Sequence, residues 1–194
     1  MRILLSSHFF YPSVGGIEQV SLALATQFAL AGHTVKVVTT TPQSNGSNFQ
    51  FEVVRRPSAR RLLELVRWSE VVFHNNISLR TWWPLIFIRR PWVIAHHTWI
   101  ARTDSSLSLR DRLKRFLTRF AANIAVSRPI AGHLTVPSTI ISNPYRDELF
   151  RRDRLATRDN DLIFVGRLVP DKGVDILIGA LKRLRQRNFL PNLT

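Results

Sequence analysis

Two short stretches of the chain contain the residue types that bind a diphosphate. Gly15 and Gly16 precede an expected helix, and glycines let a backbone approach an anion closely at a helix N-terminus. Arg167 and Lys172 follow an expected strand just before another helix, where two cations would neutralise a diphosphate. Simpler interpretations remain open: a tight turn for the glycines, and a surface ion pair with Asp171 for Arg167.

Polar residues also follow four of the expected strands. In open parallel sheets, ligands bind beyond the carboxyl ends of the strands, so these residues predict a crevice for a hydroxylated ligand. The imidazole of His97 could donate a hydrogen bond to a sugar hydroxyl or to a leaving phosphate. Ser127 fits the capping of the next helix equally well. The residues expected to bind the acceptor are His8, His74, Asn75 and Ser127.

Several kinds of chemistry are disfavoured by what the sequence lacks. The chain has no cysteine, which excludes disulfides, thiolate metal sites and cysteine catalysis, and which fits a reducing compartment. It contains no Gly-x-Gly-x-x-Gly, P-loop or Gly-x-Ser-x-Gly motif. His96 and His97 are adjacent, so on a strand they point to opposite faces and do not form a metal pair. We therefore expect neither a metal nor a cofactor.

Strands and helices alternate along the first three quarters of the chain. This alternation predicts an α/β fold, a Rossmann-like doubly wound parallel sheet, for residues 1–145. Apolar and β-branched runs predict strands at Arg2–Ser7, Val35–Thr40, Phe49–Arg55, Glu70–His74, Trp92–His97, Ile124–Ser127 and Thr139–Ser142. Helical spacing of apolar residues predicts helices at Ile17–Ala31, Ala59–Ser69 and Leu107–Ala121.

The remaining residues predict a second, incomplete structural unit. Residues 146–160 are polar and charged, as in a linker, and residues 161–194 contain a strand at Leu162–Gly166 and a helix at Val174–Arg187. One strand and one helix cannot bury their apolar faces alone. We expect them either to extend the first sheet or to begin a second domain. An exposed strand here favours self-association or pairing with a missing C-terminal half.

Positive charge is concentrated in the middle of the sequence. The net charge is +15, and residues 55–120 carry fourteen of the basic residues against four acidic ones. Such a block indicates an anionic partner: lipid headgroups, nucleic acid or a phosphorylated substrate. We expect the apolar side of Leu107–Ala121 to pack on the sheet and its cations to reach anionic lipid. The predicted membrane-surface residues are Arg60, Arg61, Arg110, Arg112, Lys114, Arg115 and Arg119.

Five motifs together resemble glycosyltransferase family 4. They are Pro-x-x-Gly-Gly-x-Glu at 12–18, Ala-His-His-Thr at 95–98, Ala-Val-Ser at 125–127, Ile-Ser-Asn-Pro at 141–144 and Phe-Val-Gly-Arg-Leu-Val-Pro-Asp-Lys-Gly at 164–173. Their order and spacing match over essentially the whole chain, and the last motif is the most specific. The resemblance implies two Rossmann-like domains of the GT-B type, the first binding the acceptor and the second a nucleotide-sugar.

The resemblance also implies roles for individual residues. Gly15 and Gly16 would lie at the donor diphosphate, His97 would contact the transferred sugar, and Arg167 with Lys172 would neutralise the leaving diphosphate. The family transfers sugars with retention of configuration and usually without a metal, here to a lipid-linked or glycan acceptor.

One departure from the family pattern is large. The acidic Glu-x₇-Glu motif of the second domain has no counterpart before residue 194, and the second Rossmann-like domain stops after its first βα unit. We therefore expect little transferase activity from this polypeptide alone.

Two other functions remain alternatives. The first is a non-catalytic module that binds a membrane, a glycan or a partner chain. The second is a basic nucleic-acid-binding protein, although no nucleic-acid-binding motif is present. The expected location is the cytoplasm, peripherally at the inner face of the membrane.

Overall fold

The computed structural model describes residues 1–42, 48–101, 107–145, 147–150, 160–166 and 168–193. The chain divides into two compact units, Met1–Tyr145 and Arg146–Thr194.

The first unit is built on a seven-stranded sheet in which every strand pair is parallel. The strand order is β3-β2-β1-β4-β5-β6-β7, so the chain reverses direction across the sheet next to β1, as in doubly wound folds. The predicted α/β Rossmann-like fold is confirmed. The strands are β1 (Arg2–Ser7), β2 (Thr34–Thr39), β3 (Glu52–Arg55), β4 (Val71–Asn75), β5 (Trp92–His96), β6 (Ala122–Ala125) and β7 (Thr139–Ile140).

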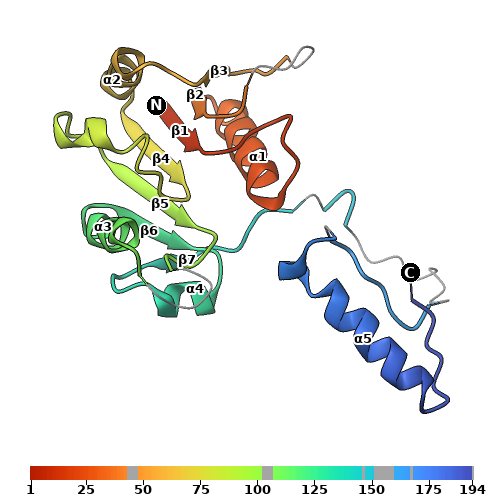
Figure 1. The fold of residues 1–194 in the computed structure, drawn as a ribbon. Coiled ribbons are helices and arrows are strands. Elements are labelled where there is room, and N and C mark those ends of the chain that lie inside the picture. Colours follow the sequence, from red (N-terminus) through yellow and green to blue (C-terminus); the bar gives the residue numbers. More distant parts are fainter. Residues whose placement is uncertain (43–47, 102–106, 146, 151–159, 167, 194) are drawn as a thin grey trace. The chain divides into compact units, whose positions relative to one another are not determined.

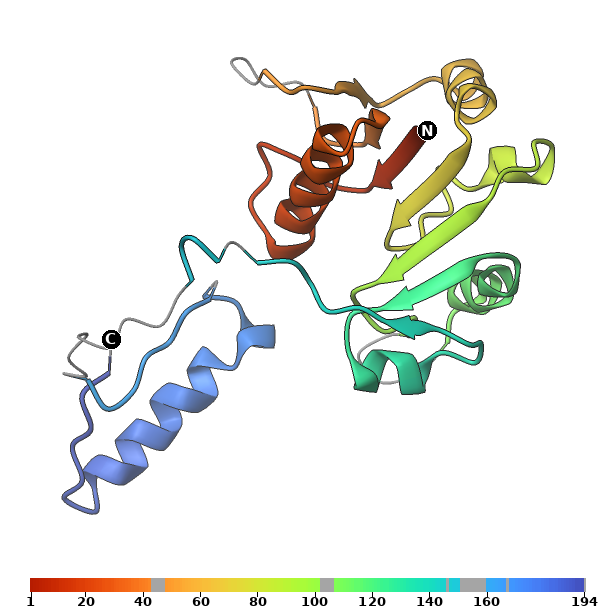
Figure 2. The ribbon, with the colours of Figure 1, turned by 180° about the vertical axis from the view of Figure 1, so that it is seen from behind.

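Two apolar clusters cover opposite faces of this sheet (Figures 1 and 2). On one face, α1 (Gly16–Leu30) packs through Ala25 against Leu5, Val37 and Phe73. On the other face, α2 (Ala59–Trp68), the 3-10 helix η1 (Trp83–Ile86) and α3 (Leu109–Leu117) surround Ile94. The almost uninterrupted apolar sequence of the central strands follows from this burial on both sides.

Side-chain caps explain where two of these helices begin. Ser58 accepts a hydrogen bond from the Arg61 N–H at the start of α2. Ser108 and Asp111 form a reciprocal capping box, which moves the start of α3 from the predicted Leu107 to Leu109. After α3, the chain continues as the 3-10 helix η2 (Thr118–Phe120).

Two helices of the first unit are missing from the sequence prediction. They are η1 and α4 (Arg128–His133), and both carry a proline in their first turn. Proline is tolerated there because the first N–H groups of a helix have no partner within the helix.

The second unit contains the 3-10 helix η3 (Pro170–Lys172) and α5 (Val174–Arg185). Gly173 joins them at φ +68°, a left-handed conformation that favours glycine. The predicted strand at Leu162–Gly166 is wrong, since Leu162 makes only an isolated parallel bridge to Leu193 in the described part of the chain. The apolar side chains Val165, Leu168 and Ile176 are exposed within this unit.

No helix in the described residues is long and apolar enough to cross a membrane.

Candidate functional site

A polar cavity of about 710 Å³ lies at the carboxyl ends of β1 and β2. This is the position at which open parallel sheets bind ligands. Its hydroxyl groups come from the end of β1, from the Thr39–Thr41 run and from the segment after β4. The lining is Ser6, Ser7, His8, Phe9, Ser13, Val38, Thr39, Thr40, Thr41, Pro42, Arg56, Pro57, Leu62, Ser78, Arg80 and Thr81.

The first cavity wall is fixed by hydrogen bonds between the two strand ends. The His8 carbonyl oxygen accepts from the Thr39 Oγ1 and Thr40 Oγ1 hydroxyls at 3.1 and 2.6 Å. The Thr41 hydroxyl accepts from the Phe10 N–H at 2.9 Å. These contacts hold the residues after β1 against those after β2, with the His8 side chain at the cavity. Burial lowers the pKa of His8, and the positive charges of Arg80 and Lys114 lower it further.

His74 is not among the residues that line the cavity, so the structure does not bring its side chain to the place where an acceptor would bind. The side chain is completely buried, and both ring nitrogens have partners. The Trp92 indole Nε1–H donates to His74 Nδ1 at 2.7 Å, so Nδ1 is the unprotonated nitrogen. The other nitrogen, Nε2, therefore carries the hydrogen and donates to Thr81 Oγ1 at 2.9 Å.

This chain of buried hydrogen bonds ends at the cavity with Thr81, whose hydroxyl lies 2.7 Å from Ser6 Oγ. Burial lowers the pKa of His74 to about 3, so the ring is neutral at pH 7. His74 thus fixes two lining hydroxyls instead of touching a ligand itself.

A second cluster joins the end of β4 to the first turn of α1. His97 Nε2 and Asn75 Oδ1 are 2.5 Å apart, and the Asn75 amide nitrogen donates to Ile17 O at 3.1 Å and to Ser21 Oγ at 2.6 Å. Asn76 Oδ1 accepts from the His97 backbone N–H at 2.8 Å. Asn75 is buried, and all its side-chain groups are engaged within the protein, so it too supports the site from below.

The two ring nitrogens of His97 differ in their hydrogen bonds. Because Asn75 Oδ1 accepts from Nε2–H, the Nδ1 atom is the hydrogen-bond acceptor. It is buried and makes no hydrogen bond of good geometry with the described residues, although the Asn143 amide is near enough to raise its basicity. Burial is the larger influence and, with the charge of His96, lowers the pKa of His97. The neutral imidazole thus has one acceptor nitrogen, Nδ1, which is buried in the described structure.

The two predicted glycines lie at the start of α1, in the helix whose first turn contacts Asn75. Gly15 is the N-cap residue and has an extended backbone, and Gly16 is the first residue of the helix. A side chain added at Gly16 would meet no atom within 4 Å, whereas one at Gly15 would collide with the Glu18 carboxylate. Glu18 therefore lies over the N-terminus that a diphosphate would approach.

The other predicted site residues are more dispersed. Ser127 is the N-cap of α4 but makes no side-chain capping bond, and it does not line the described cavity. Lys172 ends η3 in the second unit. Arg167 lies outside the described residues.

The predicted membrane-surface cations separate into groups. Arg60 and Arg61 form ion pairs with Glu64, and Arg61 also pairs with Glu52. Arg115 is turned inward, because it donates to Ile100 O at 3.3 Å and to His133 Nε2 at 2.7 Å. Lys114 is half-buried, whereas Arg110, Arg112 and Arg119 are exposed.

The expected packing of the apolar side of α3 on the sheet is also wrong. Leu117 is buried, but Leu109 is 83% exposed, Phe116 52% and Phe120 65%. Phe116, Leu117 and Phe120 instead line one side of a 570 Å³ groove, with residues of η1 and Arg89, Arg90, Pro91 and Trp92 on the other.

Sequence reasoning missed much of the cavity lining, namely Ser6, Thr39–Thr41, Arg56, Ser78, Arg80 and Thr81. The run of three threonines at the end of β2 is the signal that could have identified it, because this strand is adjacent to β1 in the sheet. Among the described residues, no group of three or more His, Asp or Glu side chains could hold a metal ion.

Solved structures with a similar fold include a sucrose-phosphate synthase and two glycosyltransferases. A sucrose-phosphate synthase from Thermosynechococcus elongatus superposes with a TM-score of 0.64 at 15% identity, covering 94% of this chain and 60% of its own. An α-glucosyltransferase in complex with UDP and a 13-mer DNA gives a TM-score of 0.59 at 16% identity, covering 94% and 53%. WaaG, a glycosyltransferase involved in lipopolysaccharide biosynthesis, gives 0.58 at 17% identity, covering 98% and 61%.

These likenesses define the class of fold: an α/β Rossmann-like fold as in GT-B glycosyltransferases. The chain spans about 60% or less of the length of these three structures. No protein-family model and no curated protein sequence matches the chain.

Proposed function

We propose that the chain takes part in glycosyl transfer, as the acceptor-binding part of a retaining GT-B enzyme that uses a nucleotide-sugar. The observation that carries the proposal is the hydroxyl-lined cavity at the carboxyl ends of β1 and β2. The fold around it is similar to that of the glycosyltransferases named above. Hydroxyl groups and a neutral imidazole are suited to bind the hydroxyls of an acceptor. The UDP bound to one structural neighbour supports a nucleotide-sugar as donor.

The proposed reaction forms one bond and breaks another at the anomeric carbon. An acceptor oxygen forms a bond to the anomeric carbon while the bond between that carbon and the diphosphate oxygen breaks. The proton of the acceptor hydroxyl passes to the departing diphosphate. In this proposal, the N-terminus of α1 behind Gly15 and Gly16 neutralises the diphosphate without a metal. Arg167 and Lys172 stay predicted diphosphate-binding residues. His97 would accept a hydrogen bond from the transferred sugar through Nδ1.

Acceptor binding can be tested on the chain itself, because the cavity lies within the first unit. Saturation-transfer NMR should detect contact with a saccharide acceptor from a mixed panel. His8→Ala and Thr81→Val should weaken the signal severalfold, since each removes a polar group from the cavity. Ser138→Ala, which is away from this cavity, is the matched control.

Transfer is then assayed by mass spectrometry with UDP-sugars, GDP-sugars and the same acceptors, and the anomeric configuration of any product is read by NMR. Saccharide binding that is indifferent to His8→Ala and Thr81→Val would overturn the assignment of the acceptor cavity. An inverted product would refute the retaining mechanism, and loss of turnover with EDTA would refute the metal-free mechanism.

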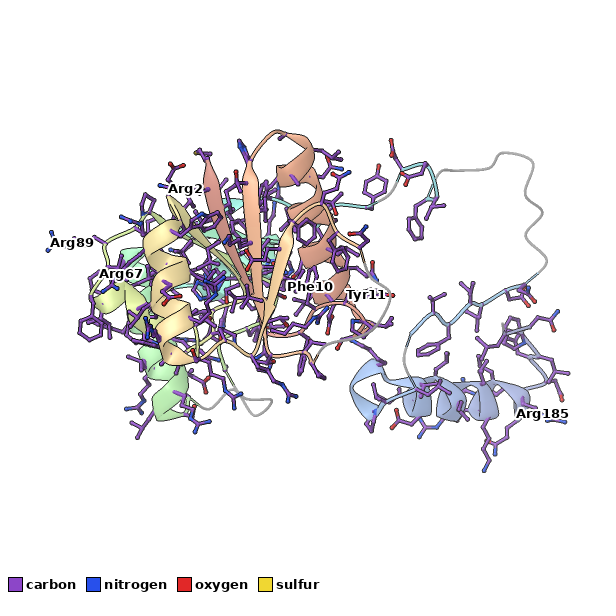
Figure 3. The ribbon with its side chains drawn as sticks, turned by 90° about the horizontal axis from the view of Figure 1, so that it is seen from above. Arg2, Phe10, Tyr11, Arg67, Arg89 and Arg185 are labelled. Atoms are coloured by element: carbon purple, nitrogen blue, oxygen red, sulfur yellow. The ribbon has the colours of Figure 1, made fainter. Side chains whose placement is uncertain are left out.

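We also propose that the first unit docks on an anionic membrane surface through η1 and α3. The favouring observation is the apolar groove between them, bordered by exposed Ile86, Phe116 and Phe120. Arg112 and Arg119 form no ion pair with any described carboxylate. Arg89 projects outward on the same side of the sheet (Figure 3). Apolar side chains between uncompensated cations match the boundary between acyl chains and anionic headgroups.

The docking proposal is tested by co-sedimentation with vesicles of phosphatidylcholine, with and without phosphatidylglycerol. The double variant Arg112→Gln/Arg119→Gln should bind anionic vesicles about tenfold or more weakly, because each cation near such a surface contributes about 1 kcal/mol. Arg60→Gln/Arg61→Gln makes the same charge change at residues already paired with glutamate, and it should bind nearly as wild type. Equal binding to neutral and anionic vesicles would contradict the proposal.

A further inference from the structure

The cavity at the ends of β1 and β2 is bordered by cations that form no ion pair with a carboxylate of the described residues. Arg56 and Arg80 are lining residues, and the described lining contains no aspartate or glutamate. Neither arginine forms an ion pair with a described carboxylate. A neutral sugar needs no such charge, so the cavity is more cationic than hydroxyl recognition requires.

The neighbouring Arg55 adds a further positive charge. Its guanidinium donates only to backbone carbonyls in the described structure: Tyr11 O at 2.9 Å, Pro42 O at 3.1 Å and Thr41 O at 3.4 Å. Arg55 thereby ties the segment after β1 to the segment after β2 at the edge of the cavity. Its charge stays uncompensated, because carbonyl oxygens carry only partial negative charge.

The position of Arg56 is fixed by the backbone. Its φ is +48°, a conformation that residues other than glycine rarely adopt, and its N–H donates to Thr39 O at 2.8 Å. Its side-chain Nε donates to Thr40 O at 2.9 Å, and its two terminal nitrogens make no hydrogen bond with the other described residues.

Two positive charges act electrostatically on a residue inside the cavity. The positive charges of Arg80 and Lys114 both lower the pKa of His8, next to the lining hydroxyls. The volume of about 710 Å³ lies within the range that holds small ligands. The serine and threonine hydroxyls of the lining can bind the hydroxyl groups of a ligand, and the guanidinium groups beside them can bind an anionic group of the same ligand.

We infer that this cavity takes a phosphorylated sugar or polyol, with the phosphate between Arg56 and Arg80 and the hydroxyls on the Ser and Thr side chains. The inference rests on the proposed function, because it names the class of acceptor for the same cavity. A free sugar phosphate and the phosphorylated headgroup of a lipid present this same chemistry.

Calorimetry on the full chain tests the inference with glucose 6-phosphate and myo-inositol 1-phosphate, each against its unphosphorylated counterpart. At least one phosphorylated compound should bind about tenfold or more tightly than its counterpart, and its affinity should fall as salt is added. Arg80→Gln and Arg56→Gln should each weaken that binding about tenfold. Arg67→Gln, on the outer surface of α2 away from the cavity, makes the same charge change and should have little effect (Figure 3).

Three results would overturn the inference. Equal affinity for a compound with and without its phosphate, no binding of any of the four, or equal losses in Arg67→Gln and Arg80→Gln would overturn the inference. Displacement of myo-inositol 1-phosphate by phosphatidylinositol vesicles, but not by phosphatidylcholine vesicles, would assign the site to a lipid headgroup; binding without displacement would assign it to a free sugar phosphate. Phosphate-dependent binding alone would sustain the inference, whereas support for the transferase function requires a transferred sugar in the mass-spectrometry assay.

Discussion

The neutral, buried His74 makes the stability of the fold depend on pH in a way that can be calculated. Burial lowers the pKa of His74 to about 3, whereas an unfolded chain presents a histidine near 6.5. Below pH 6.5 the unfolded state therefore binds a proton that the folded state does not. The stability contributed by the neutral ring is complete above pH 6.5 and is lost as the pH falls toward 3.

The size of the effect follows from the two pKa values. Between pH 7.5 and pH 5.0 the protonation of His74 in the unfolded state alone lowers the free energy of unfolding by about 2 kcal/mol, at about 1.4 kcal/mol per pH unit. The pKa of His96 is also lowered by burial, so wild type should lose at least this much. A pH of 5.0 is chosen because the carboxylates of Glu52 and Glu70, whose pKa values are lowered, remain ionised there.

The assay is urea unfolding followed by tryptophan fluorescence at both pH values, in wild type and in His74→Gln. The variant is less stable at pH 7.5 because it cannot reproduce both hydrogen bonds, but its loss between pH 7.5 and 5.0 should be smaller by about 2 kcal/mol. His33→Gln removes a histidine outside the core and is the control. If His74→Gln loses as much stability as wild type over this pH interval, the account of a neutral buried ring is refuted.

Three further substitutions test the packing that supports the site, all by the same unfolding measurement at pH 7.5. Trp92→Phe removes the donor to His74 Nδ1 and leaves a buried acceptor unpaired, so it should cost about 1–3 kcal/mol; a neutral effect would contradict the assigned hydrogen bond. Leu65→Ala opens a cavity beneath α2 and should cost about 2–5 kcal/mol, and a cost under 1 kcal/mol would contradict its burial. Ser108→Ala removes the N-cap of α3 and should cost about 1 kcal/mol, whereas Ser108→Asp should restore most of it.

The sequence contained enough information for the sheet but not for the surroundings of its strand ends. Alternating β-branched and helical segments identify β1, β2, β4 and β5 to within one residue, because burial on both faces leaves an almost continuous apolar run. The same pattern places His74 at a strand end but does not reveal Trp92 on the neighbouring strand, whose indole occupies one ring nitrogen. Whether a polar residue contacts a ligand or supports one depends on such non-local contacts.

The misassigned side of α3 has a related cause. Helical spacing shows that Leu109, Leu113, Phe116, Leu117 and Phe120 share one side of a helix, but it does not show what covers that side. In the fold, η1 and the strands reach Leu117, while Phe116 and Phe120 remain beside the groove. The periodicity was interpreted correctly, and the error came from assuming that every apolar side faces a sheet.

The arginines show why a net charge of +15 overstates the charge available to a ligand. Arg60 and Arg61 are compensated by glutamates, so they add little to the field at a distance. Arg115 uses its guanidinium to join α3 to His133, which makes it a structural residue despite its place in a basic helix. Guanidinium groups without a carboxylate partner can attract an anion. Among those of the described first unit, Arg56 and Arg80 line the hydroxyl-lined cavity, and Arg89 and Arg90 line the groove beside η1. The two proposals therefore depend on different arginines, and substitutions at Arg80 and Arg112 should affect sugar-phosphate binding and vesicle binding independently of each other.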